Sequence, residues 1–281
     1  MTMKVSEAVL TAGASLKSLV KIALLSRRPT VSRAPEAASR PLVILANGPS
    51  LRKTIAERLD DLKDMPTMSV NFAALADEFT QIRPGRYILA DPHFFAHGDD
   101  KNVATLWSRL AAVDWPMTLY VDARQRRKAL AMAALPPNVR IETFNAVGVE
   151  GWRWLETAAY RSRLAMPRPR NVLIPAIMTA IGAGFKEIYI AGADHSWLQS
   201  IWVTEDNEVV SVQPHFYKED DEEKKRVVNE YKSYRLHQIL ESFRVAFESY
   251  HRIARYARRA GVRIYNSTPG SYIDAFERKM F

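Results

Sequence analysis

The sequence predicts an α/β fold: a Rossmann-like, mostly parallel sheet with helices on both faces, an irregular lid and C-terminal helices. Short apolar runs alternate with stretches of helical periodicity over residues 41–281, which is typical of parallel sheets. In the first strand-turn-helix unit, a buried strand over Leu42 to Leu45 leads through Asn47-Gly48-Pro49 into a helix over 51–62. We expect one domain over 41–281, with residues 1–40 forming an N-terminal segment and linker.

The turn after this first strand is the most informative segment. Ser50 directly follows Asn47-Gly48-Pro49, so it can cap the helix while free N–H groups at the helix start face an anion. The same residue types also connect strands to helices where no ligand binds, and this motif alone leaves both interpretations open. It lacks the glycine spacing of a dinucleotide fingerprint and the lysine of a P-loop, which disfavours NAD and ATP sites of those kinds.

Further strands are expected at recurring apolar or β-branched runs, namely Met65 to Asn71, Arg86 to Asp91, Pro116 to Val121, Asn138 to Phe144, Ile188 to Ala191 and Val262 to Tyr265. Polar residues end three of them: Asn71, Asp91 and the turn Gly192-Ala193-Asp194. Because the carboxyl ends of parallel strands meet at one edge of a sheet, we expect these residues to converge with Asn47 and Ser50.

Three helices and a lid complete the expected domain. A basic helix is expected over 124–134 and an apolar helix over 171–183, with Asn171 as its cap. Residues 196–222 lose regular periodicity beside the ligand edge, which is typical of a lid. A charged helix follows, with an apolar face from Val227 to Tyr250 and arginines in its last turns; these suit the helix dipole and need no nucleic-acid explanation.

Composition limits the classes of protein to consider. The chain has 281 residues, 47% hydrophobic content and no cysteine, so it can bury a core but cannot form disulfides or thiolate metal sites. A reducing cytoplasm is compatible with this composition. The net charge of +9 favours an anionic partner without selecting among a nucleotide, a phospholipid surface and nucleic acid.

The N-terminal segment has its own pattern, a basic amphipathic helix before a linker over 28–40. No uninterrupted apolar run approaches the roughly 20 residues that cross a bilayer, so we predict no transmembrane helix. Lys17 and Lys21 also interrupt the apolar region that a secretory signal would need. We favour packing of this helix on its own domain or on a partner; the alternative is peripheral contact with an anionic inner membrane.

Four segments together resemble the bacterial sialyltransferases of lipooligosaccharide assembly and the related flagellin-modifying and pterin-pyrophosphokinase-like proteins. They are ILANGPSL (44–51), SVN (69–71) with ADPHFF (90–95), GFKEIYIAGAD (184–194) and IYNSTPGS (264–271). The resemblance covers about residues 41 to 281. It implies a metal-independent transferase without a cofactor, which moves a nonulosonic sugar from a CMP-activated donor to a glycan or lipid-linked acceptor.

The resemblance also implies roles for individual residues. Asn47, Gly48 and Ser50 would hold the phosphate and ribose of the donor, Asn71 and Asp91 would contact the nucleotide, and Gly192, Ala193 and Asp194 would cradle the cytidine side. In the lid, His215 is the match for the general base toward the acceptor hydroxyl, and Tyr217 could donate to the departing phosphate. A neutral histidine suits that proton at neutral pH. His195 is the competing base.

The chain departs from the sialyltransferases at two places. His195-Ser196-Trp197 stands where they carry a tyrosine after the Gly-x-Asp turn, and Arg170-Asn171-Val172 stands where they carry Thr-Ser-Gly. These differences weaken the case for sialic acid as the sugar and leave the nucleotide site in place.

Other conspicuous residues have simpler interpretations. His93 and His97 lie close to Asp91, but three ligands from one loop are seldom a metal site, and we predict none. Trp152, Trp154 and Tyr160 are interpreted as packing residues, and Arg124, Arg126, Arg127 and Lys128 as a solvated helix face.

Two alternative functions stay open. A pterin pyrophosphokinase would share the turn and need ATP with acidic metal ligands, for which Asp91 and Asp194 are available. A non-enzymatic basic module would bind nucleic acid or membrane, although no recognised nucleic-acid motif is present, and we predict no nucleic-acid partner. Association into a homo-oligomer also stays open.

Overall fold

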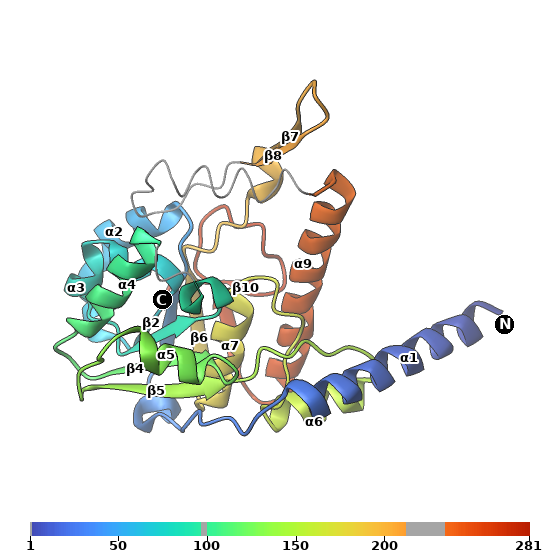
Figure 1. The fold of residues 1–281 in the computed structure, drawn as a ribbon, viewed down its shortest axis with the longest axis horizontal. Helices are drawn as coiled ribbons and strands as arrows, with labels where there is room; N and C mark the ends of the chain where they lie inside the picture. Colours follow the sequence, from blue (N-terminus) through green and yellow to red (C-terminus); the bar gives the residue numbers. More distant parts are fainter. Residues whose placement is uncertain (1, 97–99, 212–233) are drawn as a thin grey trace.

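The computed structural model describes residues 2–96, 100–211 and 234–281 (Figure 1). Its helices are α1 (Thr2–Leu25), α2 (Ser50–Asp64), α3 (Glu78–Ile82), α4 (Lys101–Ala111), α5 (Arg126–Met132), α6 (Arg153–Arg161), α7 (Leu173–Gly182) and α9 (Leu236–Arg259), with 3-10 turns η1 (Pro35–Ala38), η2 (Asn71–Leu75), η3 (Pro92–Phe95) and η4 (Trp197–Ser200). Its strands are β1 (Leu42–Leu45), β2 (Thr67–Val70), β3 (Arg86–Leu89), β4 (Met117–Asp122), β5 (Val139–Phe144), β6 (Glu187–Ala191), β7 (Ile201–Val203), β8 (Val209–Ser211), β9 (Arg263–Asn266) and β10 (Glu277–Arg278).

The central sheet has eight strands in the order β10-β9-β6-β1-β2-β3-β4-β5. All of its neighbouring pairs are parallel. The chain builds outward from β1 to β5, then returns to place β6 on the other side of β1, where Leu45 pairs with Ala191. The order therefore reverses between β1 and β6, and this is where open α/β sheets bind ligands. The predicted fold class is confirmed.

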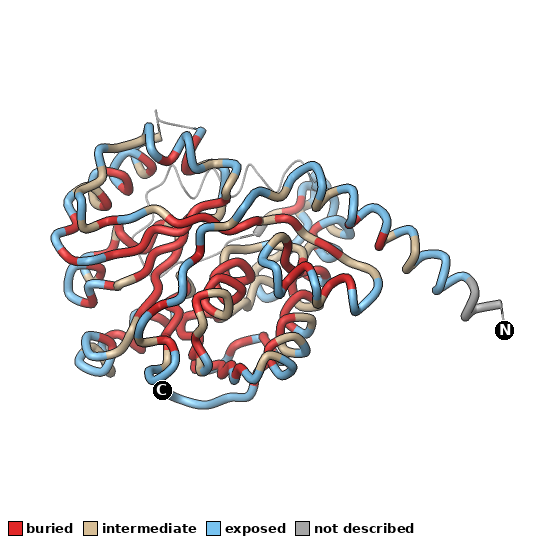
Figure 2. The backbone as a smooth tube through the Cα atoms, turned by 90° about the horizontal axis from the view of Figure 1, so that it is seen from below, coloured by how far each residue is buried: buried red, intermediate tan, exposed pale blue. Residues whose placement is uncertain are grey.

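Strand β1 is buried on both faces, which explains its uninterrupted apolar sequence. Leu42 and Ile44 join the core cluster that contains α7 and α9 residues, whereas Val43 and Leu45 join the cluster that contains α2, α3 and α4 residues. In Figure 2 the strands form a buried layer between helices on its two faces. Alternating side chains of one strand thus hold both helix layers to the sheet.

Several elements were not expected from the sequence. Helix α4 begins after Asp100, whose carboxylate accepts from the backbone N–H groups of Asn102 and Val103. Helix α6 and strand β10 were also missed. The expected lid contains η4 and an antiparallel hairpin of β7 and β8; its remaining residues, 212–222, lie outside the described part of the chain, as does the start of the expected charged helix.

The expected apolar helix is α7, whose N-cap residue is Val172 and not Asn171 as expected. Asn171 Oδ1 still accepts from the N–H of Leu173 at 3.1 Å, so its side chain satisfies one backbone donor at the helix start. The basic residues at the start of α5 are exposed, as expected for a solvated face. Arg124 lies just before this helix and pairs with the buried carboxylate of Asp122.

The N-terminal segment is a long helix followed by a strap along β5. Helix α1 is long and apolar enough to cross a membrane by length and composition, since Ser6–Leu25 has a mean hydropathy of 1.6. A core helix or a signal sequence meets the same test. This criterion averages over the helix and so tolerates Lys17 and Lys21, whereas the prediction of no transmembrane helix required an uninterrupted apolar run. That prediction stays a prediction.

Candidate functional site

The carboxyl ends of β1, β2 and β6 are joined by hydrogen bonds. The N–H of Gly48 donates to Gly192 O at 2.8 Å, which ties the turn after β1 to the turn after β6. Asn47 Nδ2 donates to Val70 O at 3.2 Å, which ties the same turn to the end of β2. The structure therefore brings Asn47, Gly48 and Gly192 together at the crevice where the strand order reverses. We call this group of turns the rim.

Two glycines allow the turns of the rim to approach this closely. A Cβ atom on Gly48 would lie 2.1 Å from Asp194 Oδ2 and 2.5 Å from Gly192 O. Gly192 has a φ of +71°, and a Cβ there would lie 2.7 Å from the Cβ of Leu51. Since real side chains do not occupy such space, both positions require glycine for packing alone.

The start of helix α2 is occupied by a carboxylate of the protein itself. Asp194 Oδ2 accepts from the hydroxyl of Ser50 at 2.8 Å and from its N–H at 3.3 Å. The N-cap residue is Pro49, so the expected capping role of Ser50 was wrong: its hydroxyl donates to Asp194. A phosphate bound at this helix start would meet the negative charge of Asp194. The chain thus fills the anion position that the turn motif predicted.

The turns after β1 and β2 each carry a buried amide oxygen without a partner. Within the described residues, Asn47 Oδ1 and Asn71 Oδ1 are buried and accept no hydrogen bond. Asn71 has a φ of +47°, a conformation that is uncommon outside glycine. An unsatisfied buried acceptor costs about 1–3 kcal/mol. Together with Asp194, these oxygens give the rim an excess of hydrogen-bond acceptors, which suits a ligand rich in hydroxyl or amino groups.

Asp91 lies apart from this group. It follows β3, is exposed, and accepts from the N–H of His93 at 2.8 Å. Strands β1 and β2 separate β3 from β6, so the backbones of Asp91 and Asp194 are about 14 Å apart at the usual strand spacing. In the part of the chain that the structure describes, no three His, Asp or Glu residues are grouped as metal ligands are; His97 lies outside that part.

Beyond Asp194, a chain of hydrogen bonds fixes the proton of His195. Asn171 Oδ1 accepts from Leu173 N–H, so this atom is the amide oxygen. The hydroxyl of Tyr250 donates to that oxygen at 2.9 Å, so toward His195 Nε2, 2.6 Å away, it can only accept. His195 therefore carries its proton on Nε2, and Nδ1 keeps its lone pair.

The surroundings of His195 hold it neutral. Burial lowers its pKa from 6.5 to about 3, and its ring lies against Trp197 with centroids 4.2 Å apart. Tyr250 is fully buried, and burial raises the pKa of its hydroxyl. A histidine with so low a pKa is a weak proton acceptor at neutral pH. The backbone of His195 has a φ of +53°, which turns the chain sharply after Asp194.

The loop after β9 supports the rim from behind. Thr268 Oγ1 accepts from the N–H of Ala193 at 3.0 Å, and Ser271 Oγ donates to Ala193 O at 2.6 Å. Both residues are at most 5% exposed. This supporting role was not expected from the sequence, where the loop enters only through the resemblance of IYNSTPGS (264–271). The sequence signal for it is the run of small polar residues directly after an apolar strand.

The remaining predicted residues, His215 and Tyr217, lie outside the described residues. Asn171 adds one feature that sequence analysis missed: within the described residues, its Nδ2 is buried and makes no hydrogen bond. The described site therefore consists of the acceptor-rich rim, with Asn171 linked to it through Tyr250 and His195.

No protein-family model matches the sequence, and no curated protein is similar to it. Among solved structures, the chain is similar to the MAf glycosyltransferase from Magnetospirillum magneticum AMB-1, with a TM-score of 0.51 and 11% sequence identity. The match covers 96% of this chain and 38% of the other, so the chain spans less than half of that neighbour. At this identity the likeness establishes the fold alone, and it agrees with the parallel sheet described above.

Proposed function

We propose that this protein is a glycosyltransferase that moves a nonulosonic sugar from a CMP-activated donor to a glycan or lipid-linked acceptor. The observation that carries the proposal is the acceptor-rich rim at the point where the strand order reverses. The structural neighbour is a glycosyltransferase with the same fold, and the motifs of residues 41–281 resemble those of sialyltransferases. All three point to a nucleotide-sugar donor.

The chemistry of the rim suggests which part of the donor binds there. Asn47 Oδ1 and Asn71 Oδ1 lack donors within the described residues, and Asp194 has a carboxylate. A cytidine offers ribose hydroxyls and an exocyclic amino group, which are donors of the required kind. Acidic residues bind ribose hydroxyls in other nucleotide-binding sheets. We therefore assign the nucleoside to the rim and the phosphate to a position away from Asp194.

The transfer needs two further groups. Charge develops on the departing phosphate as the sugar takes on oxocarbenium character, and the acceptor hydroxyl must lose its proton. Asn171 Nδ2 is a buried donor available for the phosphate side, where Tyr217 is also assigned. His195 is a weak base because its pKa is about 3, which favours His215 as the proton acceptor.

A pyrophosphokinase is less compatible with this arrangement. That reaction needs Mg²⁺ held by nearby carboxylates, with metal–oxygen distances of about 2.1 Å. Asp91 and Asp194 follow strands that are separated by two others, so they are too far apart to share one ion. The glycosyltransferase proposal needs no metal ligand from this chain.

A thermal-shift panel with the full chain tests the proposal. CMP, CDP, UDP, GDP and ATP are added separately, each with and without Mg²⁺. We expect CMP to raise the melting temperature most, without Mg²⁺, because a ligand at 100 times its Kd adds about 2.7 kcal/mol of stability. Stabilisation by ATP only with Mg²⁺, or by none of the nucleotides, would overturn the proposal.

The Asp194→Asn variant then tests where the nucleoside binds. Asparagine keeps an oxygen for Ser50 but loses the charge, so we expect a weaker response to CMP. Asp206→Asn, which changes a carboxylate in the exposed turn between β7 and β8, is the matched control and should respond as the wild type does. A stronger response of Asp194→Asn would mean that the phosphate binds at the start of α2 and that our assignment is wrong.

A further inference from the structure

Helix α1 packs on the domain largely through small polar residues and presents most of its large apolar residues to solvent; Ile22 packs against the core. Ser15 and Ser18 are at most 3% exposed. The exposed residues are large and aliphatic: Val9, Leu10, Leu16, Leu19, Val20, Leu24 and Leu25, each between 38% and 72% exposed. Most of these lie opposite Ser15 and Ser18 at helical periodicity. This is the reverse of an ordinary surface helix.

Two tryptophans extend this apolar surface. Trp152 and Trp154 are 41% and 64% exposed, and their rings stack with centroids 5.9 Å apart. The N–H of Trp152 donates to Ser15 Oγ at 2.9 Å, so the pair begins beside α1. The interpretation of both tryptophans as packing residues was wrong, whereas Tyr160 is buried as expected. We call the exposed aliphatic residues of α1 with Trp152 and Trp154 the apolar face.

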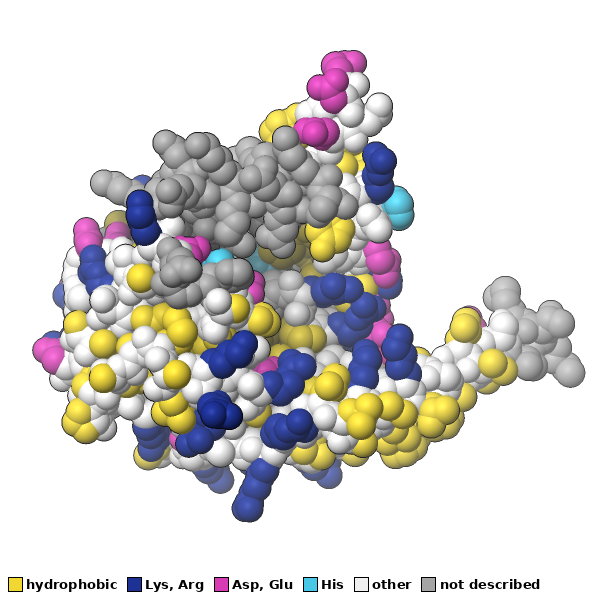
Figure 3. Space-filling model, in the orientation of Figure 1, with side chains coloured by type: hydrophobic (Ala, Val, Ile, Leu, Met, Phe, Trp, Pro, Cys, Tyr) yellow, Lys and Arg dark blue, Asp and Glu magenta, His cyan; other side chains and the backbone are white. Residues whose placement is uncertain are grey.

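The apolar face is accompanied by positive charge. Lys17 lies within it, and Arg27 and Arg28 are exposed just beyond the end of α1. Figure 3 shows hydrophobic side chains along one edge of α1 and many Lys and Arg side chains over the adjoining part of the domain. The chain carries a net charge of +9. A partner that combines apolar interior with negative surface charge is therefore favoured over a second copy of this basic chain.

We propose that the apolar face docks on an anionic phospholipid bilayer, with α1 lying in the membrane surface. Aliphatic side chains would enter the boundary of the acyl chains, as in other interfacial helices. Tryptophan is enriched at that depth because it has an apolar body and a polar N–H group. Lys17 can extend its stem toward the lipid headgroups. This inference does not depend on what the rim binds.

The C-terminal half of α1 is attached too firmly for the helix to cross the bilayer. Ser18 Oγ donates to Glu150 O at 2.7 Å and accepts from Glu150 N–H at 2.9 Å. A Cβ on Gly151 would lie 2.8 Å from Ser15 Cα, so the two backbones are in direct contact. The described part of α1 before this attachment, residues 2–14, spans roughly 20 Å at 1.5 Å per residue, less than the roughly 30 Å hydrocarbon core.

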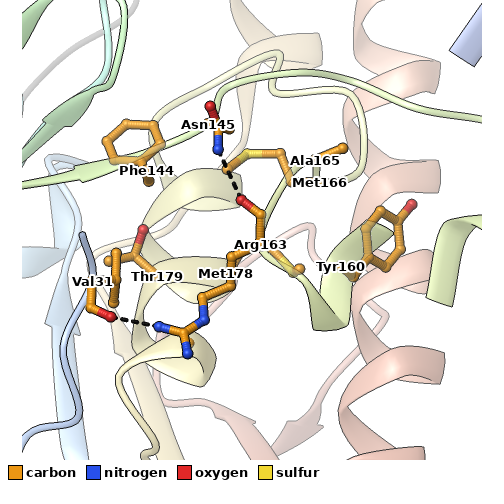
Figure 4. A pocket seen from close by; sticks show the side chains of 10 residues that line it. Val31, Phe144, Asn145, Tyr160, Arg163, Ala165, Met166, Met178 and Thr179 are labelled. Atoms are coloured by element: carbon orange, nitrogen blue, oxygen red, sulfur yellow. Dashed lines mark hydrogen bonds between the residues drawn. The ribbon is translucent and has the colours of Figure 1, made fainter. Parts of the chain in front are cut away.

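The strap after α1 fixes its direction. The side chain of Asn145, at the end of β5, binds both the N–H and the carbonyl of Arg27 at 2.8 Å. Figure 4 shows Asn145 directed at Arg163, whose guanidinium in turn reaches Val31. The apolar face is therefore held in one orientation relative to the domain.

Co-sedimentation of the full chain with vesicles tests the proposal. We expect binding to mixed phosphatidylcholine and phosphatidylglycerol vesicles and much weaker binding to phosphatidylcholine alone. The double variant Leu16→Gln/Leu24→Gln should reduce binding about tenfold, and Lys17→Gln about fivefold on the anionic vesicles only. Equal binding by wild type and double variant, or no binding by the wild type, would overturn the proposal.

Matched controls separate the apolar face from exposed apolar residues in general. Leu130→Gln changes a leucine on α5 that is 55% exposed, and Trp202→Gln, a control for Trp154→Gln, changes a tryptophan that is 49% exposed. Both control variants should bind as the wild type does, and Trp154→Gln should not. Loss of binding in the controls would contradict the assignment. Melting temperatures confirm that each variant is folded.

Two further outcomes would also overturn it. Analytical ultracentrifugation without lipid tests a second copy as the occupant: a dimer that Leu16→Gln/Leu24→Gln dissociates would assign the apolar face to self-association. Alkaline carbonate extraction tests spanning, because a surface helix is released and a transmembrane helix is retained. We expect the protein to be monomeric without lipid and to be released fully from membranes by alkaline carbonate.

Discussion

The rim and the apolar face use their side chains in opposite ways. At the rim, polar groups bind one another: the hydroxyl of Ser50 donates to the carboxylate of Asp194, and the N–H of Gly48 donates to Gly192 O. At the apolar face, large aliphatic side chains point away from the domain, although burying them would stabilise it. In Figure 2 most of α1 is exposed or half-buried, whereas the strands that carry the rim are buried.

Because of this difference, the two regions tolerate substitutions to different degrees. At the rim, the backbones of neighbouring turns lie in close contact, so few substitutions can be accommodated there without a steric clash. The apolar face is defined by what it leaves exposed, and its helix tolerates change so long as Ser15 and Ser18 keep their contacts. Substitutions of the same kind should therefore have very different effects in the two regions.

The largest effect is expected from Gly48→Ala. Its new methyl group would overlap Asp194 Oδ2 and Gly192 O, so we expect a loss of about 3 kcal/mol in the free energy of unfolding, at the upper end of the usual range for overpacking. Urea denaturation measures this. Gly85→Ala is the matched control, because nothing lies within 4 Å of its Cβ position, and it should change stability by less than about 0.5 kcal/mol. Equal effects of both would contradict the tight packing of the rim.

Tyr250→Phe should have the next largest effect. It removes the hydroxyl that joins His195 to Asn171 and leaves the buried Nε2–H of His195 without this acceptor, at a cost of about 1–3 kcal/mol. Tyr234→Phe, at a tyrosine that is 48% exposed, should be neutral. Nitrogen NMR should find the His195 proton on Nε2 in the wild type; a proton on Nδ1 would refute the inferred hydrogen-bond chain.

The pH dependence of stability should follow His195. Its pKa is lowered to about 3 in the folded state from an ordinary 6.5, so the unfolded chain takes up a proton first as the pH falls. The stability contributed by neutral His195 is present above pH 6.5 and is lost below it, by up to about 2 kcal/mol at pH 5.

Replacement of His195 by glutamine should flatten this loss between pH 6.5 and 5, as measured by urea denaturation at each pH. His237→Gln, at an exposed position on α9, should retain the wild-type slope. An unchanged slope in His195→Gln would mean that other groups cause the acid sensitivity.

The smallest effect is expected at Gly13→Ala, the counterpart of Gly48→Ala in α1. Nothing lies within 4 Å of the Cβ position of Gly13, and alanine is favoured over glycine in a helix by at most about 1 kcal/mol. Hydrogen exchange in α1 should slow while the melting temperature changes little. Faster exchange would show that Gly13 has a packing role.

The sequence predicts the parallel sheet because short apolar runs alternate with stretches of helical periodicity. Polar or glycine residues after these strands, such as Asn47, Asn71 and Gly192, mark the turns. The sequence also predicts that these turns meet. It could not predict that Asp194 would occupy the start of α2, because that contact depends on side-chain geometry between distant segments. The unpartnered oxygens of the asparagines were invisible for the same reason. These oxygens changed the expected ligand of the rim from a phosphate to a group of hydrogen-bond donors.

The orientation of α1 was beyond sequence reasoning for a different physical cause. Periodicity identifies an apolar stripe and normally places it inward. Here the inward side is chosen by the contact of Ser15 and Ser18 with Glu150 and Gly151, which only small residues permit. The helix was predicted, but the direction of its apolar residues was not.

The pairing of Ser50 with Asp194 joins positions 144 residues apart in the chain. Such distant contacts form late, because a long loop must close before they can be made. During synthesis, the first five strands can associate while the crevice still lacks its second wall, and only the arrival of β6 completes it. The nucleotide affinity that we propose should therefore be absent from nascent chains that end before β6, and binding would then mark a molecule whose two halves have come together.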